Sequence, residues 1–206
     1  MTAPNPDRSP GIADAVPPGC PGAREIGFAI SQTYNASRIL FDNLARGYGD
    51  RPALIGPAGS RSYAELCADA ARWGHGFVSL GLKRGDRVLM FLDDTPAYPA
   101  AFFGAVRAGF VPLLINTLTP PDLLQFYLSD SGASVAVADS EFCARFDAVA
   151  CQDTALRTLI VVNGAAGEDA APTTIAADPW LSRFPAELAE AEIGRASCRE
   201  RVSPRV

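Results

Sequence analysis

The sequence predicts an α/β fold in which helices flank a mostly parallel sheet. Three continuous apolar runs of strand length, typical of strands buried on both faces, lie at Val88–Leu92, Val111–Ile115 and Val135–Ala138. Two helical segments separate them, Pro96–Ala108 and Pro120–Ser131, and each begins with proline and is followed by glycine. Alternating strands and helices imply right-handed crossovers, and therefore parallel strands.

The segments before this run predict a helix and a small hairpin. Residues 1–33 are rich in proline and glycine and lack hydrophobic periodicity, so we expect a mobile segment. Helical spacing of apolar residues then predicts a short helix over Ser37–Arg46. Two short strands, Ala53–Ile55 and Ser60–Ser62, flank Gly-Pro-Ala-Gly and predict a hairpin.

A longer helix is expected to begin directly after the hairpin. The spacing of Ser62 and Glu65 is typical of a capping box, in which each residue satisfies a backbone amide of the other. Gly81 ends the pattern. The residues of the helix that share one apolar stripe are Leu66, Ala70, Trp73, Phe77 and Leu80.

Beyond Asp139 the pattern predicts a helix over Glu141–Ala150 and a further strand over Leu156–Val162. Residues 163–172 are rich in glycine, alanine and acidic residues and predict a surface loop. A weak helical pattern follows over Trp180–Ala189.

Composition and charge narrow the classes of partner. The 206 residues carry a net charge of −5 and a pI near 4.9, which gives no electrostatic reason to expect nucleic acid or an anionic membrane. No apolar run approaches the roughly 18 residues that span a bilayer. The N-terminus has proline, glycine and acids where a signal peptide needs an apolar core. A cytoplasmic protein is expected.

The cysteines and the histidine do not predict a metal site or a disulfide framework. The cysteines are odd in number and form no Cys-x-x-Cys pair; they are Cys20, Cys67, Cys143, Cys151 and Cys198. Cys67 and Cys143 fall in helical patterns and are expected to be small core residues. His75, the only histidine, has no neighbouring nucleophile or acid and is expected to be a partly packed helix residue.

Gly85–Asp139 resembles the N-terminal region of the adenylate-forming acyl-CoA synthetases, the AMP-binding superfamily. The resemblance rests on Gly-Asp-Arg-Val, on a helix that ends in Ala-Gly-Phe, and on the runs VPLLINTLTP and LSDSGASVAVAD, and it extends over residues 34–162. Two local features, Tyr34–Leu44 and Ile115–Leu118, look most like the benzoate–CoA ligase branch.

The resemblance implies a fragment of an ATP-dependent carboxylic acid–CoA ligase for benzoate or a related aromatic acid. Such enzymes form an acyl-adenylate from the acid and ATP, assisted by Mg²⁺, and then transfer the acyl group to coenzyme A. On this basis residues 34–191 are an incomplete N-terminal part of the large domain, truncated before the phosphate-binding loop. Lys83, the sole lysine, does not lie in a loop of that kind. No catalytic, cofactor-binding or metal-binding residue is therefore assigned, and the fragment alone is expected to be inactive and to bind these cofactors poorly.

Two other interpretations remain open. One is another adenylate-forming enzyme, such as a peptide-synthetase adenylation domain. The other is a non-enzymatic α/β binding module that shares only the topology.

Several residues at the ends of the predicted strands are candidates for a site. Asp93 and Asp94 follow a strand, where carboxylates often serve chemistry, but capping of the helix at Pro96 is the favoured interpretation. Asn116 and Thr117 end the next strand, and a turn is favoured there over a ligand site.

Five aromatic residues, Trp73, Phe77, Phe102, Phe103 and Phe110, fit the packing of helices on a sheet. Together they are more apolar surface than an incomplete sheet is expected to cover, and uncovered apolar patches favour association. The fragment is therefore expected to self-associate.

The last residues, 192–206, break sharply in composition. The eleven residues EIGRASCRERV fit a set of codons that resembles, in one reading frame, a common short-read sequencing adapter. We expect a non-native tail; the alternative is a genuine basic tail for a partner.

Overall fold

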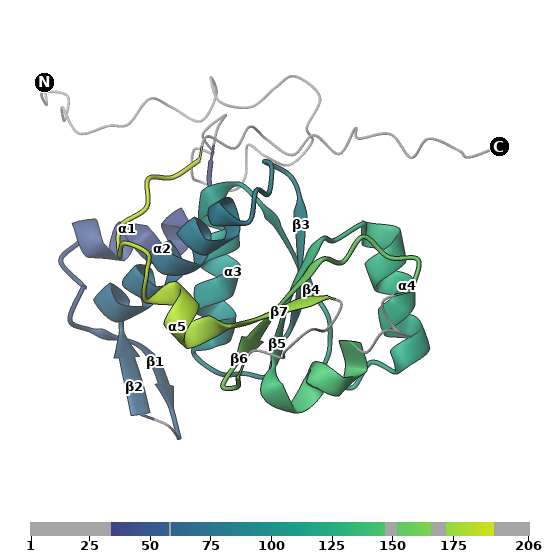
Figure 1. Ribbon diagram of the computed structural model, residues 1–206. Coiled ribbons are helices and arrows are strands. Elements are labelled where there is room, and N and C mark those ends of the chain that lie inside the picture. The colour runs from purple at the N-terminus through teal and green to yellow at the C-terminus, as the bar shows by residue number, and fades with distance from the viewer. Residues whose placement is uncertain (1–33, 58, 147–151, 166–171, 192–206) are drawn as a thin grey trace, which may run out of the picture. The chain divides into compact units, whose positions relative to one another are not determined.

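The computed structural model describes residues 34–57, 59–146, 152–165 and 172–191, and Asn35–Ala191 forms one compact unit (Figure 1). The segment 1–33, expected to be mobile, and the tail 192–206 lie outside the described residues.

A parallel sheet of five strands lies at the centre of this unit; its parallel character was predicted from the sequence, whereas its fifth strand was not. Its order is β4-β3-β5-β6-β7. The chain turns to one side of β3 to form β4 and then crosses to the other side, so the direction of winding changes between β3 and β5. The strands are β3 (Arg87–Phe91), β4 (Val111–Leu114), β5 (Val135–Asp139), β6 (Thr158–Val162) and β7 (Thr173–Ala176).

Helices cover both faces of the sheet (Figure 1). Val88 and Met90 of β3 point into the core under α2, α3 and α5, whereas Leu89 and Phe91 point into the core under α4. This alternation explains why the strand is a continuous apolar run. The helices are α1 (Arg38–Ala45), α2 (Tyr63–Ser79), α3 (Ala97–Ala108), α4 (Pro121–Ser131) and α5 (Ala177–Leu181).

The local signals before the sheet are confirmed. Strands β1 (Pro52–Gly56) and β2 (Gly59–Ser62) pair antiparallel, although residue 58 of the turn lies outside the described residues. The hydroxyl of Ser62 accepts from the Glu65 amide at 3.2 Å, and the Glu65 carboxylate accepts from the Ser62 amide at 2.8 Å, which completes the capping box. Helix α3 ends at Gly109 with φ of 89°, as expected for a glycine C-cap.

Some expectations about the strands are wrong. Strand β4 is not buried on both faces: Val111 is 49% exposed and Leu114 is 47% exposed, because β4 is the edge strand. Strand β7 was not expected, since its four residues, Thr-Thr-Ile-Ala, are too short and too polar to stand out from the loop before them.

The predicted helices after β5 also differ from those observed. The chain forms a 3-10 helix, η2 (Ser140–Phe146), in place of the start of the expected α-helix, and residues 147–151 lie outside the described part. The weak pattern over Trp180–Ala189 is helical only up to Leu181. The described residues after Leu181 form no further helix or strand.

The expectation that the aromatic residues leave apolar surface uncovered is wrong for the three most buried of the five. Trp73, Phe77 and Phe110 are 2%, 0% and 4% exposed, and Phe102 and Phe103 are partly buried against the same core. Trp180 of α5 covers Trp73, with ring centroids 6.2 Å apart. The chain thus supplies its own cover for this face of the sheet.

Candidate functional site at the carboxyl edge of the sheet

Polar side chains gather where the parallel strands end. Asp93 follows β3, Thr117 follows β4, Asp139 ends β5 and Asn163 follows β6. In open α/β sheets the crevice at the carboxyl ends, next to a change in winding direction, is the usual place for a ligand. The sheet therefore brings these four residues to the position where a site is expected.

Asp139 is the centre of this network. It is 4% exposed; one carboxylate oxygen accepts the Asp93 amide at 2.8 Å, and the other accepts the Asn163 side-chain amide at 3.3 Å. Burial raises the pKa of Asp139, and the nearby charge of Asp93 raises it further, against the two hydrogen bonds that lower it. The site thus holds two carboxylates in close electrostatic contact.

The favoured capping role of Asp93 or its neighbours is wrong. The N-cap of α3 is Pro96, and no side chain caps it. Asp93 instead accepts a hydrogen bond from the Thr117 hydroxyl at 3.1 Å and so links the ends of β3 and β4. The Thr95 hydroxyl is buried without a hydrogen-bond partner among the described residues. Proline at the N-cap explains the loss of the cap, because it carries no polar side chain.

The turn expected at Asn116 is confirmed. Its side-chain oxygen accepts the Leu118 amide at 2.8 Å, and its carbonyl accepts the Thr119 amide at 2.9 Å. Thr117 lies within this turn, and its hydroxyl donates the hydrogen bond to Asp93. The sequence analysis did not predict the hydrogen bonds among Asp93, Thr117, Asp139 and Asn163. The available signal was that each of these residues ends or follows a strand.

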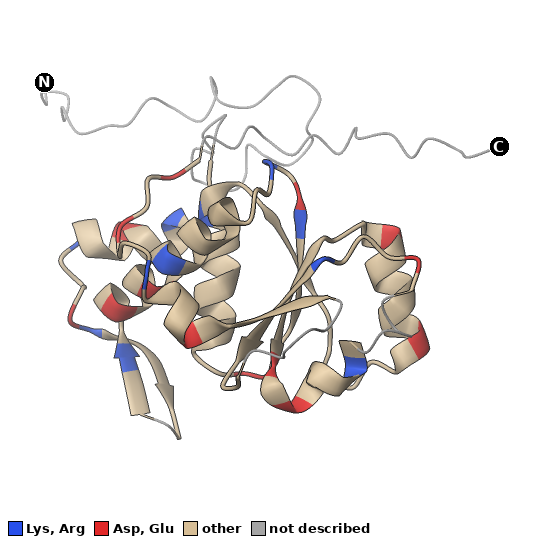
Figure 2. Cartoon of the chain, viewed as in Figure 1, with Lys and Arg blue, Asp and Glu red and all other residues tan. Residues whose placement is uncertain are grey.

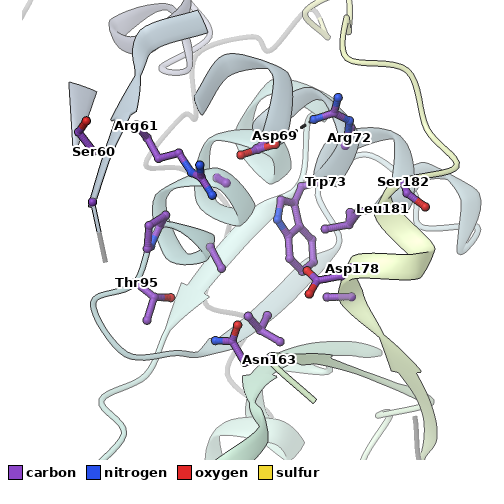
Figure 3. A pocket seen from close by; sticks show the side chains of 16 residues that line it. Ser60, Arg61, Asp69, Arg72, Trp73, Thr95, Asn163, Asp178, Leu181 and Ser182 are labelled. Carbon is purple, nitrogen blue, oxygen red and sulfur yellow. Dashed lines mark hydrogen bonds and ion pairs between the residues drawn. The ribbon is translucent and has the colours of Figure 1, made fainter. Parts of the chain in front are cut away.

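A cavity of about 630 Å³ lies beside this network, between β2, α2, the start of α3, the end of β6 and α5 (Figure 3). Its wall is mixed in charge. Arg72 pairs with Asp69 at 2.9 Å, and burial raises the pKa of Asp69 against the attraction of that arginine. The labelled polar side chains around it in Figure 3 are Ser60, Arg61, Asp69, Arg72, Thr95, Asn163, Asp178 and Ser182.

The described residues at this edge of the sheet do not fit a nucleoside triphosphate or its metal ion. Lys83, the only lysine of the chain, is exposed in the turn before β3, at the opposite edge of the sheet from the polar network. Among the described residues, no lysine or arginine belongs to the hydrogen-bonded network of Asp93, Thr117, Asp139 and Asn163, and the blue ribbon positions in Figure 2 lie on several separate elements. Within the described ranges, no group of three or more His, Cys, Asp or Glu residues is arranged to hold a metal. No step that involves ATP or Mg²⁺ is therefore derived from these residues.

His75 and the described cysteines take the structural roles expected of them. His75 lies on α2, half-buried, with Nε2 2.7 Å from the Glu187 carbonyl oxygen. Cys67 is 2% exposed in the core, and burial raises its pKa to about 11 against the nearby charge of Arg107. Burial likewise raises the pKa of Cys143, with Asp139 adding to the shift. Neither thiol is an activated nucleophile.

Comparisons with known proteins relate the chain to one family of enzymes. Residues 41–194 match the family model described as AMP-binding enzyme. The chain is 40% identical over 141 residues to a 4-hydroxybenzoate–CoA/benzoate–CoA ligase of Rhodopseudomonas palustris. The matched region is 68% of this chain and 25% of that ligase. The chain is 37% identical over 149 residues to a benzoate–CoA ligase of Thauera aromatica, covering 71% and 28%.

A solved structure gives the same relation in three dimensions. The crystal structure of an anthranilate–CoA ligase in complex with anthranoyl-AMP superposes with a TM-score of 0.75 at 25% identity, covering 81% of this chain and 31% of that one.

The family match covers more than half of the chain, so this chain belongs to the AMP-binding enzymes, the adenylate-forming acid–CoA ligase family. It resembles the benzoate–CoA and hydroxybenzoate–CoA ligases in particular. The chain spans between a quarter and a third of the length of these relatives, 25% and 28% of the two ligases. In the described part of the chain, no helix has the length and apolar character needed to cross a membrane.

Proposed function

We propose that residues 34–191 are the N-terminal part of an ATP-dependent ligase that joins an aromatic carboxylic acid, benzoate or a close relative, to coenzyme A. The observation that carries the proposal is the 40% identity over 141 residues to the ligase for 4-hydroxybenzoate and benzoate. The match to long-chain fatty acid–CoA ligase of Yersinia pestis is lower, 35% over 111 residues. The difference favours a ring over an alkyl chain in the substrate.

The reaction has two steps: the acid and ATP give an acyl-adenylate and pyrophosphate, and the thiol of coenzyme A then displaces AMP. The first step needs a loop that binds the phosphates of ATP and a positive charge near phosphorus. Because no such loop occurs in the 206 residues, the groups that bind ATP, Mg²⁺ and coenzyme A belong to sequence beyond this chain in the intact enzyme. The 206-residue chain alone is expected to be inactive.

What the chain contributes is the sheet edge that the rest of the enzyme must face. Asp139 and Asn163 fix the ends of β5 and β6, while Asp93 and Thr117 fix the ends of β3 and β4. A rigid edge of this kind supports loops that need accurate placement.

The test is to continue the coding sequence past the codon of Ala191 in the source DNA and to assay the extended product. Residues 192–206 are expected to be absent from that continuation, whereas an unbroken read that encodes them would favour a genuine basic tail. Acid-dependent and CoA-dependent release of pyrophosphate should be fastest with benzoate or a hydroxybenzoate.

Each alternative predicts a different outcome of that assay. A preference for an amino acid, with transfer to a carrier protein, would favour a peptide-synthetase adenylation domain. Absence of turnover with every acid, together with binding of a ligand by residues 34–191 alone, would favour a binding module.

A further inference from the structure

The segment 183–191, which we call the strap, has no regular secondary structure but is held closely by side chains of other elements. It follows α5 and runs over α2 and α3 (Figure 1, yellow). Unlike a surface loop, it presents its backbone carbonyls to donors that come from far away in the sequence.

Two side chains make the principal contacts along the strap. Arg107 of α3 donates from Nε to the Leu188 carbonyl at 2.6 Å, and its own carbonyl accepts the Ala191 amide at 2.8 Å. Asn35, which is 2% exposed, donates from Nδ2 to the Ala191 carbonyl at 3.2 Å. The same amide group lies 3.1 Å from the Val106 carbonyl, so Asn35 ties the strap to the end of α3.

Additional contacts give the strap a defined register. His75 binds the carbonyl of Glu187 at 2.7 Å. The carboxylate of Glu190 lies 3.3 Å from Arg38 of α1. Leu188 lies directly over Gly74, where a side-chain carbon would collide with it. A helix glycine costs stability, and this close approach is a physical reason to retain it.

The path of the strap gives it a role in topology. Helix α5 begins at the carboxyl edge of the sheet, after β7, whereas Ala191 lies beside the end of α3, at the amino edge. The strap therefore returns the chain to the edge at which a further parallel strand would begin, as the helix does in an ordinary βαβ crossover. Its docking fixes the point at which the chain leaves the domain.

We propose that Asn35 and Arg107 are positioning residues that lock the strap and thereby place the segment that follows Ala191. This rests on the proposed function, under which that segment leads into the phosphate-binding loop of the intact ligase. The two residues act through the strap and touch no substrate.

The first test uses the 206-residue chain and is independent of ligase activity. In Asn35→Ala and Arg107→Ala, cleavage by a glutamate-specific protease within the strap, and exchange of the Ala191 amide, should accelerate about tenfold, because cleavage follows the open population. Amides of β5 should keep their protection. Matched controls are Asn43→Ala and Arg145→Ala, which remove side-chain bonds to the Ile39 and Thr119 carbonyls elsewhere.

Two outcomes of this test would overturn the proposal. One is an unchanged strap; the other is equal loss of protection in the strap and in β5, which would mean that the substitutions only unfold the domain. Arg107→Lys guards against the second case, since its ammonium can still donate to the strap and should restore most of the protection.

The second test uses the extended ligase. Asn35→Ala should raise KM for ATP about tenfold and leave KM for the acid unchanged, a split that general destabilisation does not produce. An unchanged KM for ATP with an opened strap would contradict the positioning role. If the extended wild-type enzyme activates no acid, the proposed function fails, and the proteolysis result still decides whether the strap is docked.

Discussion

Replacement of Trp180 by alanine should strongly destabilise the domain. Trp180 is 8% exposed, covers Trp73 at 6.2 Å between ring centroids and stacks edge-on with Phe184 at 5.3 Å. Its ring lies so close to Gly76 that a side-chain carbon there would collide with it. Truncation of a large aromatic residue at such a site costs about 3–5 kcal/mol in the free energy of unfolding.

For a domain of this size, each kcal/mol lowers Tm by roughly 2–4 °C, so Trp180→Ala should melt about 10 °C below the wild type. The measurement is thermal and urea unfolding followed by far-UV circular dichroism, with binding of a hydrophobic dye as a second signal for the uncovered Trp73. The matched control is Phe126→Ala in α4, where the ring is 57% exposed and the change should stay within about 1 kcal/mol. A loss below about 1 kcal/mol for Trp180→Ala would refute the conclusion that α5 covers this face.

Three further predictions concern single groups. Burial raises the folded-state pKa of Asp139 above its ordinary 3.8, so the domain should lose stability as pH rises through that raised value. Asp139→Asn should abolish this loss when the free energy of unfolding is measured by urea titration from pH 4 to 7. The same pH dependence of stability in the wild type and in the variant would contradict this prediction. With a pKa of about 11, roughly one part in a thousand of Cys67 is thiolate at pH 8. Alkylation of Cys67 should therefore be at least about a hundredfold slower in the native chain than in the unfolded chain. Equal rates would show that the thiol is not buried. Ser62→Ala should cost about 1 kcal/mol in urea unfolding through loss of the cap of α2, and no change would mean that the capping box contributes nothing.

Self-association of the chain stays a prediction, with a different physical basis. The aromatic core that was expected to be uncovered is covered by the chain itself. Among the large apolar side chains that remain exposed in the described part of the chain are Leu114 of the edge strand β4, at 47%, and the neighbouring Leu118, at 83%. An unpaired edge with apolar side chains favours association. Light scattering after size-exclusion chromatography measures it, and a monodisperse monomer would contradict it.

The alternation of strands and helices was predictable from sequence because each local signal agreed with the others. The apolar run of β3, the capping box at Ser62 and the glycine after α3 all depend on contacts within a few residues. Features that depend on distant partners were not predictable. The exposure of β4 follows from its place at the sheet edge, and the strap depends on Arg107, which lies 81 residues before Leu188 in the sequence.

The candidate site shows the same division. That carboxylates and amides follow the strands is visible in the sequence, and so is their expected meeting at one edge. That Asp93 bonds to Thr117 instead of capping α3 is decided by the pairing of β3 with β4 and by the backbone at Pro96. The sequence alone does not decide between these two hydrogen-bonding roles of Asp93, because the decision depends on which strands lie side by side.

The most direct test of the central claim is the substrate preference of the extended enzyme. The coding sequence is continued past the codon of Ala191, the product is purified, and pyrophosphate release is measured with coenzyme A against benzoate, hydroxybenzoates, anthranilate, hexanoate and a long-chain fatty acid. An aromatic acid–CoA ligase should show its highest kcat/KM with benzoate or a hydroxybenzoate and should form the corresponding thioester. A higher kcat/KM with a fatty acid, or turnover by the 206-residue chain alone, would contradict the account.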